Sequence, residues 1–128
     1  MTNSEEQELT KSFFDSVKAN HLNQVIALLD KGVNANVIEK SNDFWSALMY
    51  AAEIGNNAMV EVLLAHGADP AIKAQSGNFA LSIAMKNDYD QVTKTLLRVA
   101  PEEHIYEVYD LLREDEITFL KELGRSKA

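Results

Sequence analysis

The stretch from Ser46 to Ile72, SALMYAAEIGNNAMVEVLLAHGADPAI, constrains the fold more than any other part of the sequence. Leu48, Ala51 and Ala52 are spaced i, i+3 and i+4, which predicts a short amphipathic helix, and a second apolar pattern follows a Gly-Asn-Asn break. Gly67 and the proline after it end the second helix. Neither helix reaches the roughly 12–15 residues at which an isolated helix becomes marginal in water. The helix pair therefore needs neighbours.

The same pattern recurs on both sides of this stretch. Leu81 and Ala84 lie 33 residues after Leu48 and Ala51, and Gly32 lies 35 residues before Gly67. A period near 33, with two helices and an extended turn in each unit, predicts a stack of helix pairs. The other repeating residues are Val25, Leu28 and Leu29 in the first unit, Val60, Leu63 and Leu64 in the second, and Leu96 and Leu97 in the third.

The central unit resembles an ankyrin repeat. Residues 46–52, SALMYAA, resemble the motif Thr-Pro-Leu-His-x-Ala-Ala, and residues 60–69, VEVLLAHGAD, match the remainder of that repeat. The resemblance implies an all-α ankyrin-repeat solenoid of stacked helix-turn-helix units with extended finger loops. The flanking units depart from the pattern, because Asn20 and Asp88 stand where the family has the glycine between the two helices. Phe44 replaces a third family glycine, in the finger.

The chain is expected to form one domain over residues 1–128. The units are predicted as an N-terminal capping repeat (1–40), two repeats (41–73 and 74–100), C-terminal capping helices (101–124) and a frayed tail from Arg125 to Ala128.

Charge limits the partners that the chain can bind. The net charge of −8 argues against nucleic acid and acidic membranes, which attract basic surfaces. It favours a basic protein partner, although surface acidity also serves solubility. The first residues do not resemble a signal peptide, and no apolar run approaches the ~18 residues of a membrane helix. A cytoplasmic location and no membrane association are expected.

The sequence predicts no catalytic, metal or cofactor site. There is no cysteine, and His21, His66 and His104 lie in three different units without metal-ligand spacing. Asp88 and Asp90 flank a tyrosine in a break that is too short for a calcium loop. Nucleophile-elbow and phosphate-loop motifs are missing. The chain is therefore expected not to be an enzyme.

The resemblance does imply a protein-binding surface. Ankyrin arrays bind proteins through the finger tips and the exposed face of each first helix, on the concave side. Trp45, the only tryptophan, falls on a finger next to Ile54 and suits an interface, or else packs locally on Phe44 or Tyr50. By register, the partner-binding candidates are Asn42, Asp43, Trp45, Glu53, Ile54, His66, Gln75, Ser76, Asn78, Lys86 and Asn87, with Val99 and, in the first unit, Lys18, Ala19 and Lys31 as further positions.

Several functions are compatible with such a surface. The expected function is a non-catalytic protein–protein interaction module, such as an adaptor or regulatory subunit. A stoichiometric inhibitor, resembling the immunity proteins that neutralise basic toxins, is the alternative suggested by charge. A non-catalytic subunit of an enzyme complex is a third possibility. A purely oligomerising role would require an apolar end left open at Tyr109, Ile117 or Phe119, whereas a sealed stack is expected to be monomeric.

Overall fold

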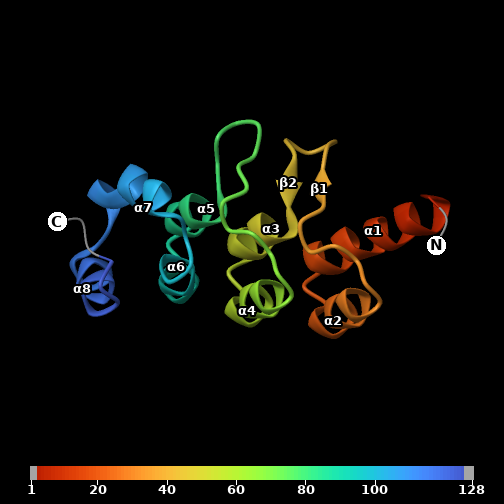
Figure 1. The fold of residues 1–128 in the computed structure, drawn as a ribbon, viewed down its shortest axis with the longest axis horizontal. Helices are drawn as coiled ribbons and strands as arrows, with labels where there is room; N and C mark the ends of the chain where they lie inside the picture. The colour runs from red at the N-terminus through yellow and green to blue at the C-terminus, as the bar shows by residue number, and fades with distance from the viewer. Residues whose placement is uncertain (1–2, 126–128) are drawn as a thin grey trace.

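The computed structural model describes residues 3–125 and contains eight α-helices in that range. The helices pair in sequence order along one axis, and the ribbon runs from α1 at one end to α8 at the other (Figure 1). The elements are α1 (Asn3–Lys18), α2 (Leu22–Asp30), β1 (Ile38–Glu39), β2 (Trp45–Ser46), α3 (Ala47–Ile54), α4 (Asn57–Ala65), α5 (Ala80–Lys86), α6 (Asp90–Leu97), α7 (Glu102–Val108), the 3-10 helix η1 (Tyr109–Leu111) and α8 (Glu114–Glu122). The predicted all-α stack is confirmed.

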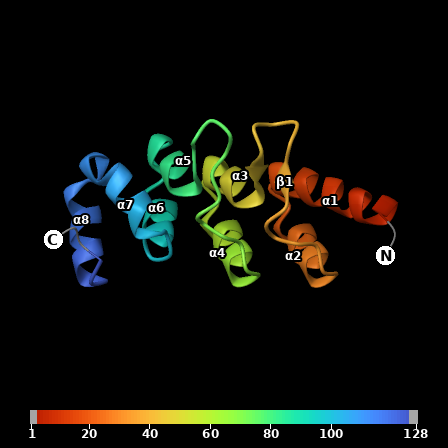
Figure 2. The ribbon, with the colours of Figure 1, turned by 45° about the horizontal axis from the view of Figure 1, so that its top comes forward.

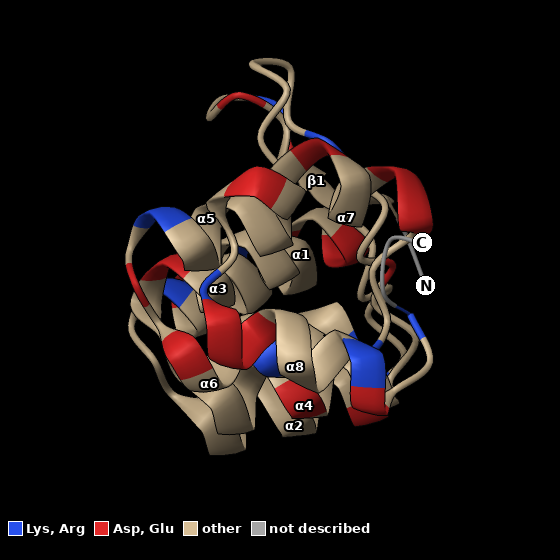
Figure 3. Ribbon diagram, turned by 90° about the vertical axis from the view of Figure 1, so that its left-hand side faces the viewer, with Lys and Arg blue, Asp and Glu red and all other residues tan. Residues whose placement is uncertain are grey.

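The helices form two layers. The hairpin layer consists of α1, α3, α5 and α7, and the outer layer consists of α2, α4, α6 and α8 (Figures 1 and 2). The antiparallel pair β1–β2 and a second hairpin loop at residues 73–79, closed by a bridge between Lys73 and Phe79, project from the hairpin layer. The view from the C-terminal end shows the same separation of layers (Figure 3).

Short helices are defined by their caps. Helix α3 begins where the Ser46 hydroxyl accepts a hydrogen bond from the Met49 amide at 3.3 Å, and it ends at Gly55, whose φ of 84° is left-handed. Asn20 and Asp88, at the corresponding breaks of the neighbouring units, adopt φ of 61° and 63°. Asn and Asp tolerate this conformation better than other side chains, so the turn survives without glycine.

Small and large residues alternate in the core between the layers. Ala51 and Ala52 are fully buried on α3, and their size lets neighbouring helices approach closely. Phe13 from α1 and Leu63 from α4 are also fully buried. Burying a side chain of this size contributes roughly 1.5–3 kcal/mol each, which offsets the low stability of 7–9-residue helices on their own.

Polar side chains connect successive units. The Asn36 side chain donates to the Gly67 carbonyl at 3.0 Å and accepts from the Asp69 amide at 2.7 Å. In the same way, Asn56 donates to the Asn20 side-chain oxygen at 2.7 Å. The two bonds of Asn36 satisfy backbone groups of the next unit, and the bond of Asn56 joins two side chains across the unit boundary.

The C-terminal unit closes the stack. The Arg125 guanidinium donates to the carbonyls of Leu97 and Ala100 at 2.7 and 2.5 Å, at the end of α6. Arg125 was predicted to begin a frayed tail; that prediction is wrong for this residue, because its charge satisfies two helix-end carbonyls. The rest of the predicted tail, residues 126–128, lies outside the described part. Phe119 on α8 is half-buried beneath the Arg98 guanidinium.

Candidate functional site

Ten of the eleven partner-binding candidates lie on the hairpin layer and its two hairpins. We call these ten the hairpin surface. None of them is buried: Asp43, Trp45 and Ile54 are half-buried and the others are exposed. The hairpin surface comprises Asn42, Asp43 and Trp45 on the first hairpin, Gln75, Ser76 and Asn78 on the second, Glu53 and Ile54 on α3, and Lys86 and Asn87 at the end of α5.

The first hairpin ends in a five-residue loop, residues 40–44, because β1 and β2 pair Glu39 with Trp45. The Trp45 amide donates to the Asn42 carbonyl at 3.1 Å, and the two residues between them, Asp43 and Phe44, have φ of 58° and 61°. These two consecutive left-handed residues form a tight turn directly before β2 begins. Phenylalanine rarely adopts this conformation, and a single such residue costs about 1–2 kcal/mol.

The two hairpins are hydrogen-bonded to each other through Asp43. Its carboxylate accepts from the Ser76 amide at 3.1 Å and from the Ser76 hydroxyl at 2.5 Å. Its carbonyl accepts from the Gln75 amide at 2.9 Å. Asp43 is a partner-binding candidate by register, but in the structure both of its carboxylate oxygens accept hydrogen bonds within the chain.

Trp45 packs on its own unit. Its ring centroid lies 5.1 Å from that of Tyr50, at 52° between planes, which is the local packing considered as an alternative to partner contact. Tyr50 is buried and receives the edge of Phe14 at 6.0 Å. Trp45 therefore packs the first hairpin against α3 and exposes only part of its side chain to solvent.

A polar network anchors the base of the first hairpin on α1 and α3. The Tyr50 hydroxyl donates to the Glu39 carboxylate and accepts from the Asn42 amide at 2.5 Å, while Lys18 lies 2.8 Å from Glu39. Burial raises the pKa of Glu39, but the hydrogen bonds from Lys18 and Tyr50 outweigh it and hold that pKa below its ordinary value. The Lys18 pKa is raised, chiefly by its hydrogen bond to Glu39.

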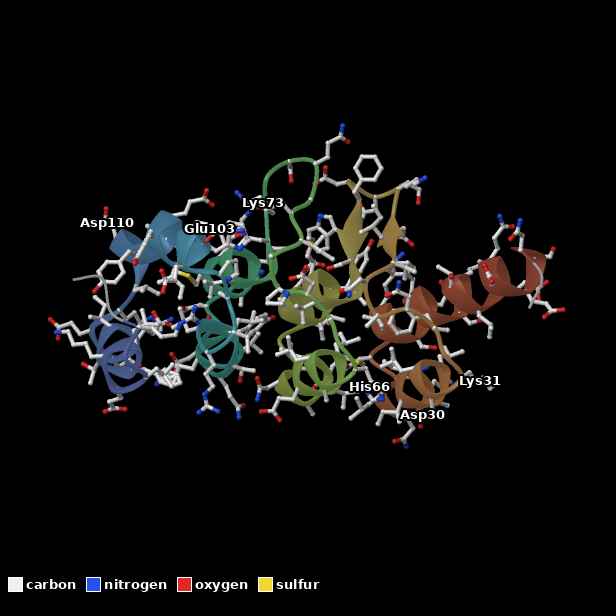
Figure 4. The ribbon with its side chains drawn as sticks, viewed as in Figure 1. Asp30, Lys31, His66, Lys73, Glu103 and Asp110 are labelled. Carbon is white, nitrogen blue, oxygen red and sulfur yellow. The ribbon has the colours of Figure 1, made fainter. Side chains whose placement is uncertain are left out.

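His66 lies apart from the other candidates. It is on the outer layer beside Asp30 and Lys31, far from the hairpins (Figure 4). Its Nδ1 lies 2.9 Å from the Val62 carbonyl, and its Nε2 lies 3.4 Å from Asp30 Oδ1. The Val62 carbonyl, with a smaller effect of Asp30, raises the pKa of His66. The placement of His66 and Lys31 on the concave side is therefore corrected: both take part in the outer layer.

Lys73 belongs to the same region and was not among the predicted residues. It lies at the base of the second hairpin, 3.4 Å from Glu107 of α7 and 5.4 Å from the centre of the Phe79 ring. The repeat period gave a usable signal, because Lys73 and Glu107 are 34 residues apart and so occupy equivalent places in consecutive units.

Open hollows lie beside α1. One of about 570 Å³ runs between α1 and the first hairpin; it is lined by Phe14, Ile38 and Glu39 among others. Over residues 3–125 there is no group of three or more His, Cys, Asp or Glu placed to hold a metal ion. In that same range no helix combines the length and apolar character needed to cross a bilayer.

Several known proteins are similar to parts of this chain. The human mitochondrial disaggregase is 41% identical over 59 residues, which are 46% of this chain and 8% of that protein. A putative ankyrin repeat protein of fowlpox virus is 36% identical over 85 residues, which are 64% of this chain and 24% of that protein. The ARF GTPase-activating protein Git of Drosophila melanogaster is 29% identical over 115 residues, 90% of this chain and 14% of that protein.

The chain thus spans at most 24% of the length of any of these three relatives. The family profile for ankyrin repeats, in three copies, matches residues 13–107, which is more than half of the chain. This match covers α1 from Phe13 onward and continues through α7. Together with the paired helices and projecting hairpins, it shows that the chain belongs to the ankyrin-repeat family.

Proposed function

We propose that this chain is a non-catalytic module that holds a protein partner on the hairpin surface. Ankyrin repeats are protein–protein interaction modules. The observation that carries the proposal is that the hairpin surface presents exposed polar side chains from four elements on one side of the molecule. Large side chains of α3 and α5, such as Leu48, Tyr50 and Leu81, are buried. Glu53 and Lys86 are exposed at the ends of α3 and α5, beside the two linked hairpins.

The test is capture of the partner from an extract of the native source by two matched variants. The first reverses charges on the hairpin surface, Glu53→Arg with Lys86→Glu. The control reverses charges on the outer layer, Glu61→Arg with Lys31→Glu. Both variants keep the net charge of the chain, and all four side chains are exposed, so both are expected to fold.

The expected result is loss of the partner from the first variant and its retention by the control and the wild type, with all three showing the same circular dichroism. Reversing a charge at a rim costs association rate and salt-dependent affinity rather than folding. Retention by the hairpin-surface variant together with loss by the control would move the binding site to the outer layer.

A second candidate function is a stoichiometric inhibitor of a basic protein, which the net charge of −8 favours through steered association. The captured partner decides between this role and an adaptor or a non-catalytic subunit of an enzyme complex: an inhibitor abolishes its activity at one-to-one stoichiometry. A cytoplasmic location and a monomeric state belong to the same proposal. Fractionation and mass measured in solution test them.

A further inference from the structure

The acidity of the chain is concentrated in its last unit. Residues 102–116 contain seven carboxylates and one arginine, a net charge of −6 out of −8 for the whole chain. The acidic and basic residues in the rest of the chain nearly cancel. Figure 3 looks along the stack from this end and shows acidic residues on both α7 and α8. The negative electrostatic potential that would attract a basic partner therefore arises mainly from the C-terminal unit and not from the hairpin tips.

Many of these carboxylates are unpaired. On α8, Asp115 lies 3.0 Å from Lys94, and Glu116 accepts from the Arg113 amide at 2.9 Å. On α7 and η1, by contrast, Glu102, Glu103 and Asp110 are exposed and make no ion pair with any residue between 3 and 125. Glu103 and Asp110 stand away from the outer layer (Figure 4). The α7 side of the unit thus carries the charge that is free to meet a partner.

The same segment exposes apolar side chains. The large apolar residues that are exposed within the described range number five, and four of them lie between residues 99 and 123. Leu111 of η1 is 75% exposed and Tyr106 of α7 is 47% exposed. The fold does not need either of them, because Ile105 and Val108 already fill the inner side of α7. Exposed apolar residues ringed by charge are typical of an interaction surface.

The spacing places these groups on one face. Glu103, Tyr106, Glu107 and Asp110 follow one another at i, i+3, i+4 and i+7, so they form a stripe along α7 that continues into η1. Helix α7 lies in the hairpin layer, next to α5 (Figures 1 and 2). We define this stripe together with Glu102 and Leu111, which are also exposed, as the α7 face. Within it, Glu107 pairs with Lys73 at the base of the second hairpin, whereas Glu103 and Asp110 have no ion-pair partner within residues 3–125.

We propose that the α7 face binds a basic amphipathic helix of the protein partner. Lysine or arginine side chains of that helix would meet the unpaired carboxylates, and its apolar side chains would cover Tyr106 and Leu111. Such a helix lays its apolar side on exposed apolar residues while charge fixes its orientation. This inference rests on the proposed function, since it assigns the charge preference of the partner to a site separate from the hairpin surface.

The probe is a 16-residue synthetic peptide of lysine and leucine at amphipathic helical spacing, fluorescently labelled. A glutamate–leucine peptide of the same pattern is the negative probe. Binding is measured by anisotropy, and amide chemical-shift changes in the ¹⁵N-labelled chain locate it. The lysine peptide is expected to shift amides of residues 102–112 and to bind less tightly as salt rises, because the attraction is ionic.

Two triple variants with equal net charge separate the site from the overall field. In the α7 variant, Glu102→Gln, Glu103→Gln and Asp110→Asn are combined; in the control on α1, Glu6→Gln, Glu8→Gln and Asp15→Asn are combined. All six residues are exposed. The α7 variant is expected to weaken binding about tenfold or more, and the control to change it less than about threefold. Tyr106→Ser with Leu111→Ser keeps the charge and is expected to weaken binding too.

The proposal is overturned if the two triple variants weaken binding equally, if the shifts fall outside the α7 face, or if the serine variant binds like wild type. Each of these outcomes would mean that the peptide responds to net charge alone or to another surface. The hairpin-surface variant is measured separately by partner capture. If the hairpin-surface variant loses the partner but the peptide does not bind the α7 face, this inference fails and the proposed function stands. If that variant keeps the partner and the peptide binds the α7 face, the proposed function fails and this inference stands.

Discussion

Gly55 is where a single added methyl group should harm the stack most. Its φ is 84°, and a Cβ at this position would lie 2.8 Å from carbons of the Tyr89 ring, which belongs to the next unit. Gly67 provides the comparison, because its φ is 89° but a Cβ there would meet nothing within 4 Å. We expect Gly67→Ala to cost about 1–2 kcal/mol of unfolding free energy from backbone strain alone. Gly55→Ala should cost about 1–3 kcal/mol more from overpacking.

Urea unfolding followed by circular dichroism at 222 nm measures both costs. Replacing Tyr89 with alanine in the Gly55→Ala chain removes the ring that clashes, so the remaining cost of the alanine, relative to Tyr89→Ala alone, should fall to the value at Gly67. Equal costs for Gly55→Ala and Gly67→Ala would refute the reasoning. So would a cost at Gly55 that does not change when the Tyr89 ring is absent.

Three further predictions concern polar contacts. Burial, and then Lys73, lower the pKa of His104, while Glu107, Glu103 and Asp69 oppose that shift. The folded state therefore favours the neutral imidazole more than the unfolded chain does. The stability that this contributes is present above the ordinary pKa near 6.5 and should fall as the pH drops below it. His104→Phe, which keeps a ring stacked on Phe79 at a site where Nδ1 has no partner within residues 3–125, should remove that part of the pH dependence in urea titrations from pH 7.5 to 5.5; an unchanged slope would contradict it. Arg125→Ala should cost about 1–3 kcal/mol because two helix-end carbonyls lose a charged donor, whereas Lys121→Ala on exposed α8 should cost little in the same assay. Asp43→Ala should speed hydrogen exchange of the Gln75 and Ser76 amides while exchange in α4 stays unchanged; slow exchange at both amides would show that the Asp43 side chain does not hold the second hairpin.

The helix pairs could be predicted from the sequence because their causes are local. The i, i+3, i+4 spacing at Leu48, Ala51 and Ala52 predicts a helix with a buried apolar stripe, and all three residues are buried. Met49 and Tyr50 are buried as well, so neighbouring elements cover α3 on more than that one side. The break at Asp88 was likewise readable, since aspartate tolerates the left-handed conformation that it adopts there. Apolar periodicity and the residues at turns were therefore enough to predict most of the helices and their boundaries.

The polar contacts between units could not be read in the same way, because they join residues about one repeat apart. Asp43 and Ser76 are separated by 33 positions, and Asp30 and His66 by 36. A register comparison places such residues on neighbouring units, but side-chain length and direction decide whether they bond or face solvent. His66 was assigned to the wrong layer for this reason. Arg125 was missed because its partners, the carbonyls at the end of α6, are brought near only by the path of α8.

The hydrogen bonds between Asp43 and the second hairpin bear on the thermodynamics of recognition. Two hairpins that are hydrogen-bonded to each other should behave as one rigid surface. Binding a partner then costs less loop conformational entropy than ordering two independent loops would. The same link prevents either hairpin from adapting to a poorly matched surface. The affinity gained in this way limits the chain to few partners. Discrimination between partners should depend on the shape of the linked hairpins more than on rearrangement of their side chains.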